Sequence, residues 1–194
     1  MEGNIGVGKT ECALCLCEKL REKGFKATVV QEEAQAWEDG GDLADKSEAG
    51  SRMFAAYGAL AGHLSRQNFV FSEAGDDFDI LFVERHPTTT VDVFDESVST
   101  RGLFEGVHDM SGSRFLNNPE RTIYLKSNPH ECFIRTQKRG RLSEKAIDEF
   151  TFETLSLKHD EMMTKRQALG GTISEFSEFS TSSHHNRIVA FLGY

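Results

Sequence analysis

Residues 3–10 read Gly3-Asn4-Ile5-Gly6-Val7-Gly8-Lys9-Thr10 and fit the phosphate-binding pattern G-x-x-x-x-G-K-[ST] without a mismatch. In such a loop the glycines let backbone N–H groups face phosphate oxygens. The lysine brings a positive charge to the β- and γ-phosphates, and the threonine hydroxyl can bind Mg²⁺. The alternative is a chance glycine-rich turn before a helix. The stretch predicts a nucleoside triphosphate site at the start of a helix.

The residues before this loop do not fit the pattern. A phosphate-binding loop normally follows a buried β-strand of a parallel sheet, whereas only Met1 and Glu2 precede this one. We therefore expect the first strand to be missing and the N-terminus to be incomplete. The sheet should then be interrupted at Met1, or something else should fill that place.

Strand and helix patterns alternate along the rest of the chain. Apolar residues at helical spacing predict a helix over residues 9–23, and a β-branched run predicts a strand over residues 27–31. Residues 79–83 are an apolar run suited to a strand covered on both faces. Further elements are expected at residues 51–71 (helix), 121–125 (strand), 128–138 and 143–167 (helices), 172–176 (strand) and 187–192 (helix). The pattern predicts one α/β domain, residues 1–194, with a parallel sheet flanked by helices on both faces.

Composition limits the possible partners and compartment. The chain has 194 residues, a net charge of −9 and a pI near 5.3, which argues against a nucleic-acid or membrane partner because either needs a basic face. Four cysteines without a signal peptide indicate a reduced intracellular compartment, the cytoplasm. Cys12, Cys15 and Cys17 fall within the first predicted helix, where they cannot all face one metal ion.

Four stretches of the chain, residues 2–10, 32–37, 84–87 and 124–144, together resemble the motifs of the deoxynucleoside kinase family. The third resembles the form found in the herpesvirus-type thymidine kinases. The family's opening motif, EGNIG-x-GK-[ST], is matched by residues 2–10. The second, E-P-V-x-x-W, is matched by Glu32 and Trp37 without the proline. The third appears as Glu84-Arg85-His86-Pro87. The fourth is matched by Tyr124, Leu125, Pro129, Cys132, Arg135, Arg139-Gly140-Arg141 and Glu144.

The resemblance implies a P-loop kinase fold that uses ATP and Mg²⁺ to phosphorylate the 5′-hydroxyl of a deoxynucleoside. Glu32, which also follows a predicted strand, is the expected base, and Arg85 the residue that holds the hydroxyl and the phosphoryl group. Lys9 is the third expected catalytic residue. Thr10 and Glu84 are expected at the metal. The ATP site is expected to comprise Gly3, Asn4, Gly6, Gly8, Lys9, Thr10, Arg135, Arg139 and Arg141.

The acceptor site follows from the same resemblance. A lid over residues 135–144 should carry the arginines that close over the phosphates, and Glu144 should accept a hydrogen bond from the sugar. Trp37 and Tyr57 are expected against the substrate. The glutamine that usually pairs with the base is replaced by Ala55, and the tyrosine that often touches the sugar would fall at Ala44. The third motif favours thymidine, with deoxycytidine close behind, and the family implies a homodimer.

Three other functions fit part of the sequence. A thymidylate-type nucleoside monophosphate kinase shares the fold and the lid arginines, but it needs an arginine set for the acceptor phosphate rather than Glu32. A GTPase-like switch should carry N-K-x-D for guanine, which the sequence lacks. A catalytically inactive nucleotide-binding homologue is the third.

Overall fold

The computed structural model describes residues 1–32, 69–70, 72–86, 89–94, 121–141, 144–145, 147–177 and 182–194. The strands described are β1 (Ala27–Val30), β2 (Ile80–Val83), β3 (Arg121–Leu125) and β4 (Thr172–Phe176). β1 pairs in parallel with β2, and β3 pairs in parallel with β4. The predicted parallel pairing is thus confirmed for these strands.

Met1 and Glu2 lie between the two pairs of strands. The Glu2 amide donates a hydrogen bond to the Ile123 carbonyl at 2.9 Å, and the Leu125 amide donates to the Glu2 carbonyl at 2.9 Å. On the other side, the Arg85 amide donates to the Met1 carbonyl at 2.8 Å. The order across the sheet is therefore β1, β2, residues 1–2, β3 and β4. Residues 1–2 thus occupy the place between β2 and β3.

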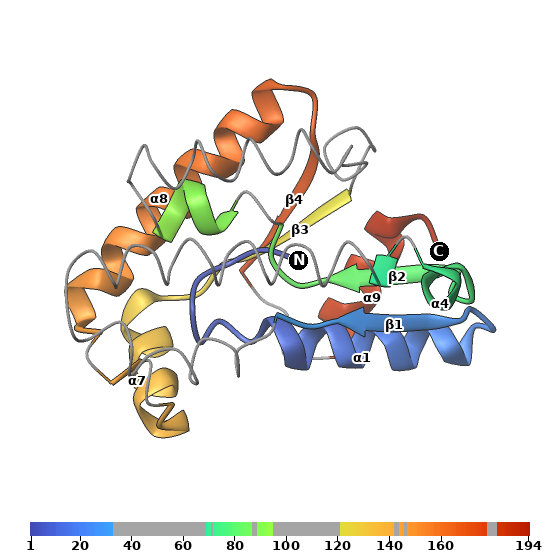
Figure 1. Ribbon diagram of the computed structural model, residues 1–194, viewed down its shortest axis with the longest axis horizontal. Coiled ribbons are helices and arrows are strands. Elements are labelled where there is room, and N and C mark those ends of the chain that lie inside the picture. The colour runs from blue at the N-terminus through green and yellow to red at the C-terminus, as the bar shows by residue number, and fades with distance from the viewer. Residues whose placement is uncertain are drawn as a thin grey trace.

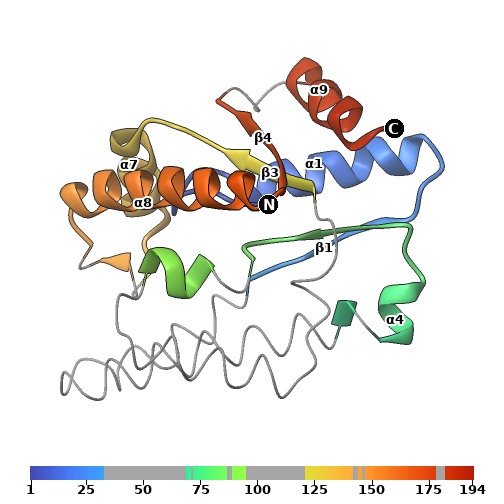
Figure 2. The ribbon, with the colours of Figure 1, turned by 90° about the horizontal axis from the view of Figure 1, so that it is seen from above.

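Helices flank the strands on both sides (Figures 1 and 2). The helices described are α1 (Lys9–Glu22), α4 (Glu73–Asp76), the π-helical turn η1 (Thr90–Phe94), α7 (Pro129–Arg139), α8 (Glu149–Ala168) and α9 (Ser182–Leu192). α1 packs against β1 and α9, whereas α8 packs against α7, η1 and β4. This arrangement agrees with the predicted α/β architecture.

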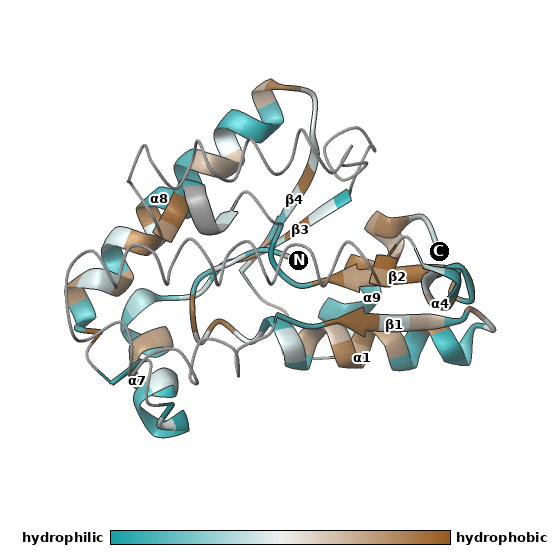
Figure 3. Ribbon diagram, in the orientation of Figure 1, coloured by the Kyte–Doolittle hydropathy of each residue, from teal (hydrophilic) through white to brown (hydrophobic). Residues whose placement is uncertain are grey.

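β3 shows how the sheet divides the apolar core. Ile123 and Leu125 belong to a cluster with buried residues of α1 and α9, whereas Tyr124 belongs to a second cluster with Leu155 and Met162 of α8. Successive side chains of a strand point to opposite faces, so each face of β3 meets a different set of helices. β1 and β2 are apolar over most of their length (Figure 3).

Two helices begin at residues other than those predicted. α8 begins at Glu149 rather than near residue 143, because Asp148 accepts a hydrogen bond from the Thr151 amide at 2.8 Å and caps the helix there. α9 begins at Ser182 rather than at residue 187. Within the described residues, no helix has the length and apolar character needed to cross a membrane.

Candidate functional site

The predicted phosphate-binding loop connects residues 1–2 to α1. Gly3, Gly6 and Gly8 have φ angles of 141°, 72° and 101°. Residues with a Cβ rarely adopt such positive φ angles. A Cβ on Gly6 would lie 2.5 Å from the Cys132 carbonyl oxygen and 2.5 Å from Thr136 Oγ1, both in α7. The loop is therefore packed closely against α7, and Gly6 is required by both its backbone angle and the space available to it.

The variant Gly6→Ala is expected to lower the free energy of unfolding by about 2–4 kcal/mol, since the overpacking and the left-handed backbone both oppose it. Gly24→Ala is the matched control: Gly24 also has a positive φ, 93°, but nothing lies within 4 Å of an added Cβ. The free energy of unfolding of this control is expected to fall by only about 1 kcal/mol. Urea unfolding measures both, and equal losses would contradict the packing described here.

Lys9 and Asn4 hold the loop in place. Lys9 Nζ donates hydrogen bonds to the carbonyl oxygens of Gly3 and Asn4, both at 3.0 Å. Asn4 Nδ2 donates to the Phe152 carbonyl and to Ser156 Oγ, both at 2.9 Å, and Asn4 Oδ1 accepts from the Ile5 amide at 2.8 Å, so its side chain ties the loop to α8. Thr10 is the second residue of α1 and is partly exposed. The loop is thus fixed to both α7 and α8.

Acidic and basic side chains meet where β1 and β2 end. Arg85 Nη1 donates to Glu32 Oε1 at 3.1 Å, and the Glu32 amide lies 3.4 Å from Glu84 Oε2. The Arg85 guanidinium also lies over the Phe94 ring, 4.4 Å from its centroid. Because the two parallel strands end at one edge of the sheet, residues 53 positions apart come together there.

This edge of the sheet carries buried polar atoms that have no hydrogen-bond partner among the described residues: Glu84 Oε1 and Arg85 Nε. Buried polar groups in folded proteins normally have partners, because leaving one unpaired costs about 1–3 kcal/mol. A free carboxylate oxygen suits a cation, and a free guanidinium N–H suits an anionic oxygen. Glu84 Oε1 and Arg85 Nε together therefore fit a site for a metal-bound phosphate.

The predicted lid residues lie in α7 and just beyond it. Arg139 Nη2 donates to Glu144 Oε1 at 2.6 Å, and Arg141 Nη1 is 3.7 Å from the same oxygen. Arg135 Nη2 donates to Glu131 Oε2 at 3.1 Å, within α7. Glu144, expected at the sugar, is therefore held by two of the arginines expected at ATP.

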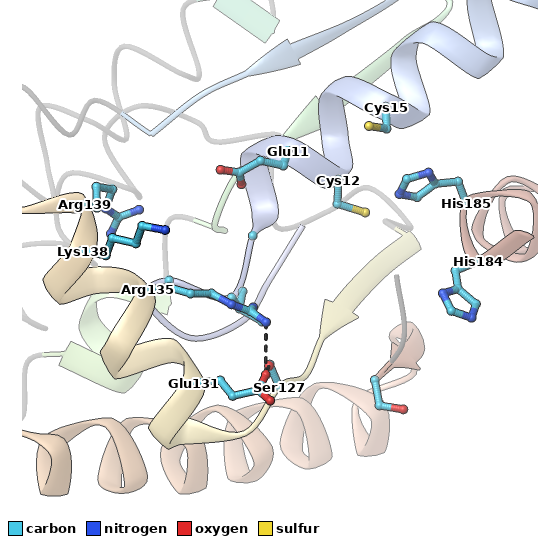
Figure 4. A pocket seen from close by; sticks show the side chains of 14 residues that line it. Glu11, Cys12, Cys15, Ser127, Glu131, Arg135, Lys138, Arg139, His184 and His185 are labelled. Atoms are coloured by element: carbon cyan, nitrogen blue, oxygen red, sulfur yellow. Dashed lines mark hydrogen bonds and ion pairs between the residues drawn. The ribbon is translucent and has the colours of Figure 1, made fainter. Parts of the chain in front are cut away.

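A cavity of about 900 Å³ opens beside the loop, between α1, α7 and α9 (Figure 4). Gly6 and Gly8 form part of its wall, and Arg135 and Arg139 line it from α7. Its volume lies within the range of small-molecule sites. The structure thus joins the loop glycines and two of the three lid arginines around one space, while Arg141 is not among the lining residues.

Some residues of the site were not expected from the sequence, and others lie outside the described part of the chain. His184 and His185 of α9 line the cavity (Figure 4). Both precede residue 187, where the sequence pattern predicts the start of the last helix, so no helical signal marked them. Trp37, Tyr57, Ala44, Ala55 and Pro87 lie outside the described residues.

Known proteins resemble this chain in both sequence and fold. The family described as deoxynucleoside kinase matches residues 1–191. Deoxyadenosine kinase from M. mycoides with the products dCMP and a flexible dCDP bound has 16% identity and a TM-score of 0.69, over 99% of this chain and 96% of that chain. The same enzyme with bound dATP has 17% identity and a TM-score of 0.67, over 99% and 96%. No curated protein sequence matches the chain. With its sequence match over residues 1–191, the chain belongs to the deoxynucleoside kinase family.

Proposed function

We propose that this chain transfers the γ-phosphoryl group of ATP to the 5′-hydroxyl of a pyrimidine deoxynucleoside, thymidine or deoxycytidine. The observation that carries the proposal is the contact between Glu32 and Arg85, 3.1 Å apart at the sheet edge, whose charges also shift the pKa of the buried Lys9. Phosphoryl transfer needs a carboxylate that receives the hydroxyl proton and cations that hold the spreading charge. Family membership supports the reaction, and the third motif favours a pyrimidine.

Each residue has a defined task in this proposal. Glu32 accepts the proton of the 5′-hydroxyl while the oxygen attacks phosphorus and ADP leaves. Arg85 and Lys9 donate hydrogen bonds to the phosphoryl oxygens. Glu84 and Thr10 would hold Mg²⁺, which neutralises phosphate charge when it is bound.

The donor and the acceptor occupy different sides of the loop in this scheme. The amides of Gly3, Gly6 and Gly8 bind the phosphates, and the cavity beside α7 holds the rest of ATP. The lid arginines Arg135, Arg139 and Arg141 then exchange their carboxylate partners for phosphate oxygens. Glu144, released from Arg139, becomes available to the sugar 3′-hydroxyl.

A phosphoryl-transfer assay with radiolabelled ATP tests the proposal. The acceptors are the four deoxynucleosides and, as a fifth, thymidine monophosphate. Transfer to thymidine or deoxycytidine alone is the expected result. Transfer to deoxyadenosine, the substrate named for the solved relatives, would overturn the pyrimidine preference. Transfer to the monophosphate alone would indicate a nucleoside monophosphate kinase, and ATP binding without transfer would indicate an inactive homologue.

ATP affinity is expected to fall as the pH rises above about 8. Burial, together with the Arg85 guanidinium, lowers the pKa of Lys9 to about 8, and the nearby carboxylates of Glu32 and Glu84 only partly oppose this. Binding a triphosphate needs the ammonium form, so affinity should fall by up to about tenfold per pH unit above that pKa. Titration calorimetry between pH 7 and about pH 9.5 measures the effect.

Lys9→Arg supplies the control, because a guanidinium stays charged over this range and the ATP affinity of this variant should not depend on pH in this way.

The stability of the protein should change in the opposite direction to its ATP affinity. Since the pKa of Lys9 is lower in the folded than in the unfolded chain, the cost of burying the ammonium is present below pH 8 and disappears as the pH rises toward 10.5. Constant ATP affinity up to pH 9.5 would contradict a depressed pKa for Lys9.

A further inference from the structure

The backbone of Arg85 is held in an unfavourable conformation. Its φ of 59° makes it the one residue other than glycine with a positive φ in the described part of the chain. A branched or long side chain is strained in this region, so such a conformation persists only where surrounding contacts enforce it. The strain falls on the residue that carries the guanidinium next to Glu32.

Two hydrogen bonds to residues 1–2 hold the peptide groups on either side of the strained residue Arg85. The Arg85 amide donates to the Met1 carbonyl at 2.8 Å. The next amide, that of His86, donates to Glu2 Oε1 at 2.6 Å. Glu2 is 2% exposed, so this contact is shielded from water. The two contacts fix successive peptide groups and thereby the direction in which the Arg85 side chain leaves the sheet.

Glu2 is held in turn by a residue near the C-terminal end of α8. Arg166 Nη1 donates to Glu2 Oε1 at 3.1 Å, and Arg166 Nη2 donates to Thr89 Oγ1 at 3.0 Å. The Thr89 hydroxyl, fully buried, also lies 2.8 Å from Glu2 Oε1. The three side chains form a closed triangle of hydrogen bonds.

The charges within the triangle compensate each other. Burial alone would raise the pKa of Glu2, but the Arg166 guanidinium, the N-terminal ammonium and the His86 amide lower that pKa to about 2. Glu2 is therefore ionised at neutral pH, and its charge depends on Arg166. Removing the Arg166 charge leaves a buried carboxylate with less to balance it.

We propose that Glu2, Thr89 and Arg166 form a positioning network that sets the conformation of Arg85 for phosphoryl transfer. The inference rests on the role proposed above for Arg85. No residue of the network has a role in the reaction in that proposal, so the network acts through the Arg85 backbone. A small displacement of a reacting group can lower the rate by about 10²-fold, which makes such positioning measurable.

The experiment is a double-mutant cycle with Arg166→Gln and Arg85→Gln. In the otherwise unchanged chain, Arg166→Gln is expected to lower kcat by about 10- to 100-fold, with the KM for ATP changed by less than about 3-fold. In the Arg85→Gln background, the same substitution should lower kcat by less than about 2-fold. Lys165→Gln is the matched control with unchanged kcat, because the neighbouring Lys165 forms an exposed ion pair with Glu161.

Two results would overturn the network. One is an equal loss of kcat in both backgrounds, which would mean that Arg166 acts independently of Arg85. The other is a folded Arg166→Gln protein with undiminished kcat. If the Arg166→Gln protein does not fold, Thr89→Val takes its place in the double-mutant cycle. This substitution removes the shared hydroxyl with little change in volume.

Failure of the proposed function can be recognised separately, because the unchanged chain would then transfer no phosphate to any nucleoside. The network is in that case judged by a crystal structure of the Arg166→Gln protein. Loss of the positive φ at Arg85, or of its contact with Glu32, supports the network. An Arg85 that keeps both overturns it.

Discussion

Replacing Glu32 with glutamine is expected to lower kcat by about 10²–10⁴-fold, the contribution typical of a positioned general base. The amide keeps the size of the side chain and can still accept a hydrogen bond from Arg85, but it cannot take the proton of the attacking hydroxyl. ATP affinity should stay near its original value, since Glu32 is proposed to face the acceptor. Single-turnover transfer measured together with ATP binding separates the two effects.

The control for this prediction is Glu22→Gln, which removes a carboxylate from the exposed end of α1. It should leave kcat unchanged. Undiminished transfer by the Glu32→Gln protein would show that another group accepts the proton, and the ion pair with Arg85 would then be structural.

Replacing Arg85 with glutamine is expected to lower kcat by about 10³-fold or more, the scale reported for arginines that neutralise a transferring phosphoryl group. The substitution removes a cation at the end of β2 and leaves Glu32 without the partner now 3.1 Å away. It also removes the guanidinium that lies over Phe94. The rate should fall much more than the affinity for ATP, which depends on the loop and Lys9.

Arg85→Lys gives a second measure of the same role. A lysine restores one positive charge without the planar fork of donors, so it should recover only part of the lost rate. Arg121→Gln serves as the control. Arg121 is an exposed arginine of β3, and it donates a hydrogen bond at 3.0 Å to the carbonyl of Phe191 in α9. A similar loss of kcat in the Arg121→Gln and Arg85→Gln proteins would exclude a specific role for Arg85.

The sequence predicted most of the local structure because each signal lies within a few residues. The apolar spacing of α1, the continuous apolar run of β2 and the Asn128-Pro129 start of α7 all depend on neighbours along the chain. Asn128 does accept a hydrogen bond from the His130 amide at 2.9 Å, as a capping residue should. Resemblance to the family supplied the site residues that spacing alone could not assign.

The remaining features depend on contacts between distant residues. Arg166 lies 164 positions from Glu2, and no pattern near residue 166 indicates that its side chain reaches the start of the chain. The predicted start of α8 near residue 143 is also wrong, because the residue that caps the helix is Asp148. The ion pair between Glu144 and Arg139 could not be predicted either, because in sequence alone both look like solvated surface charges.

The phosphate-binding loop depends on residues that follow it at a great distance along the chain. Asn4 bonds to Phe152 across 148 residues, and Gly6 packs against the backbone of α7 near Cys132. Contacts across such separations form slowly because a long segment must first be ordered. On a ribosome, residues 3–10 therefore emerge before the helices that shape them. A nascent chain that ends before α8 has the sequence of a nucleotide site without these contacts, so capture of a nucleotide can report that α8 has docked.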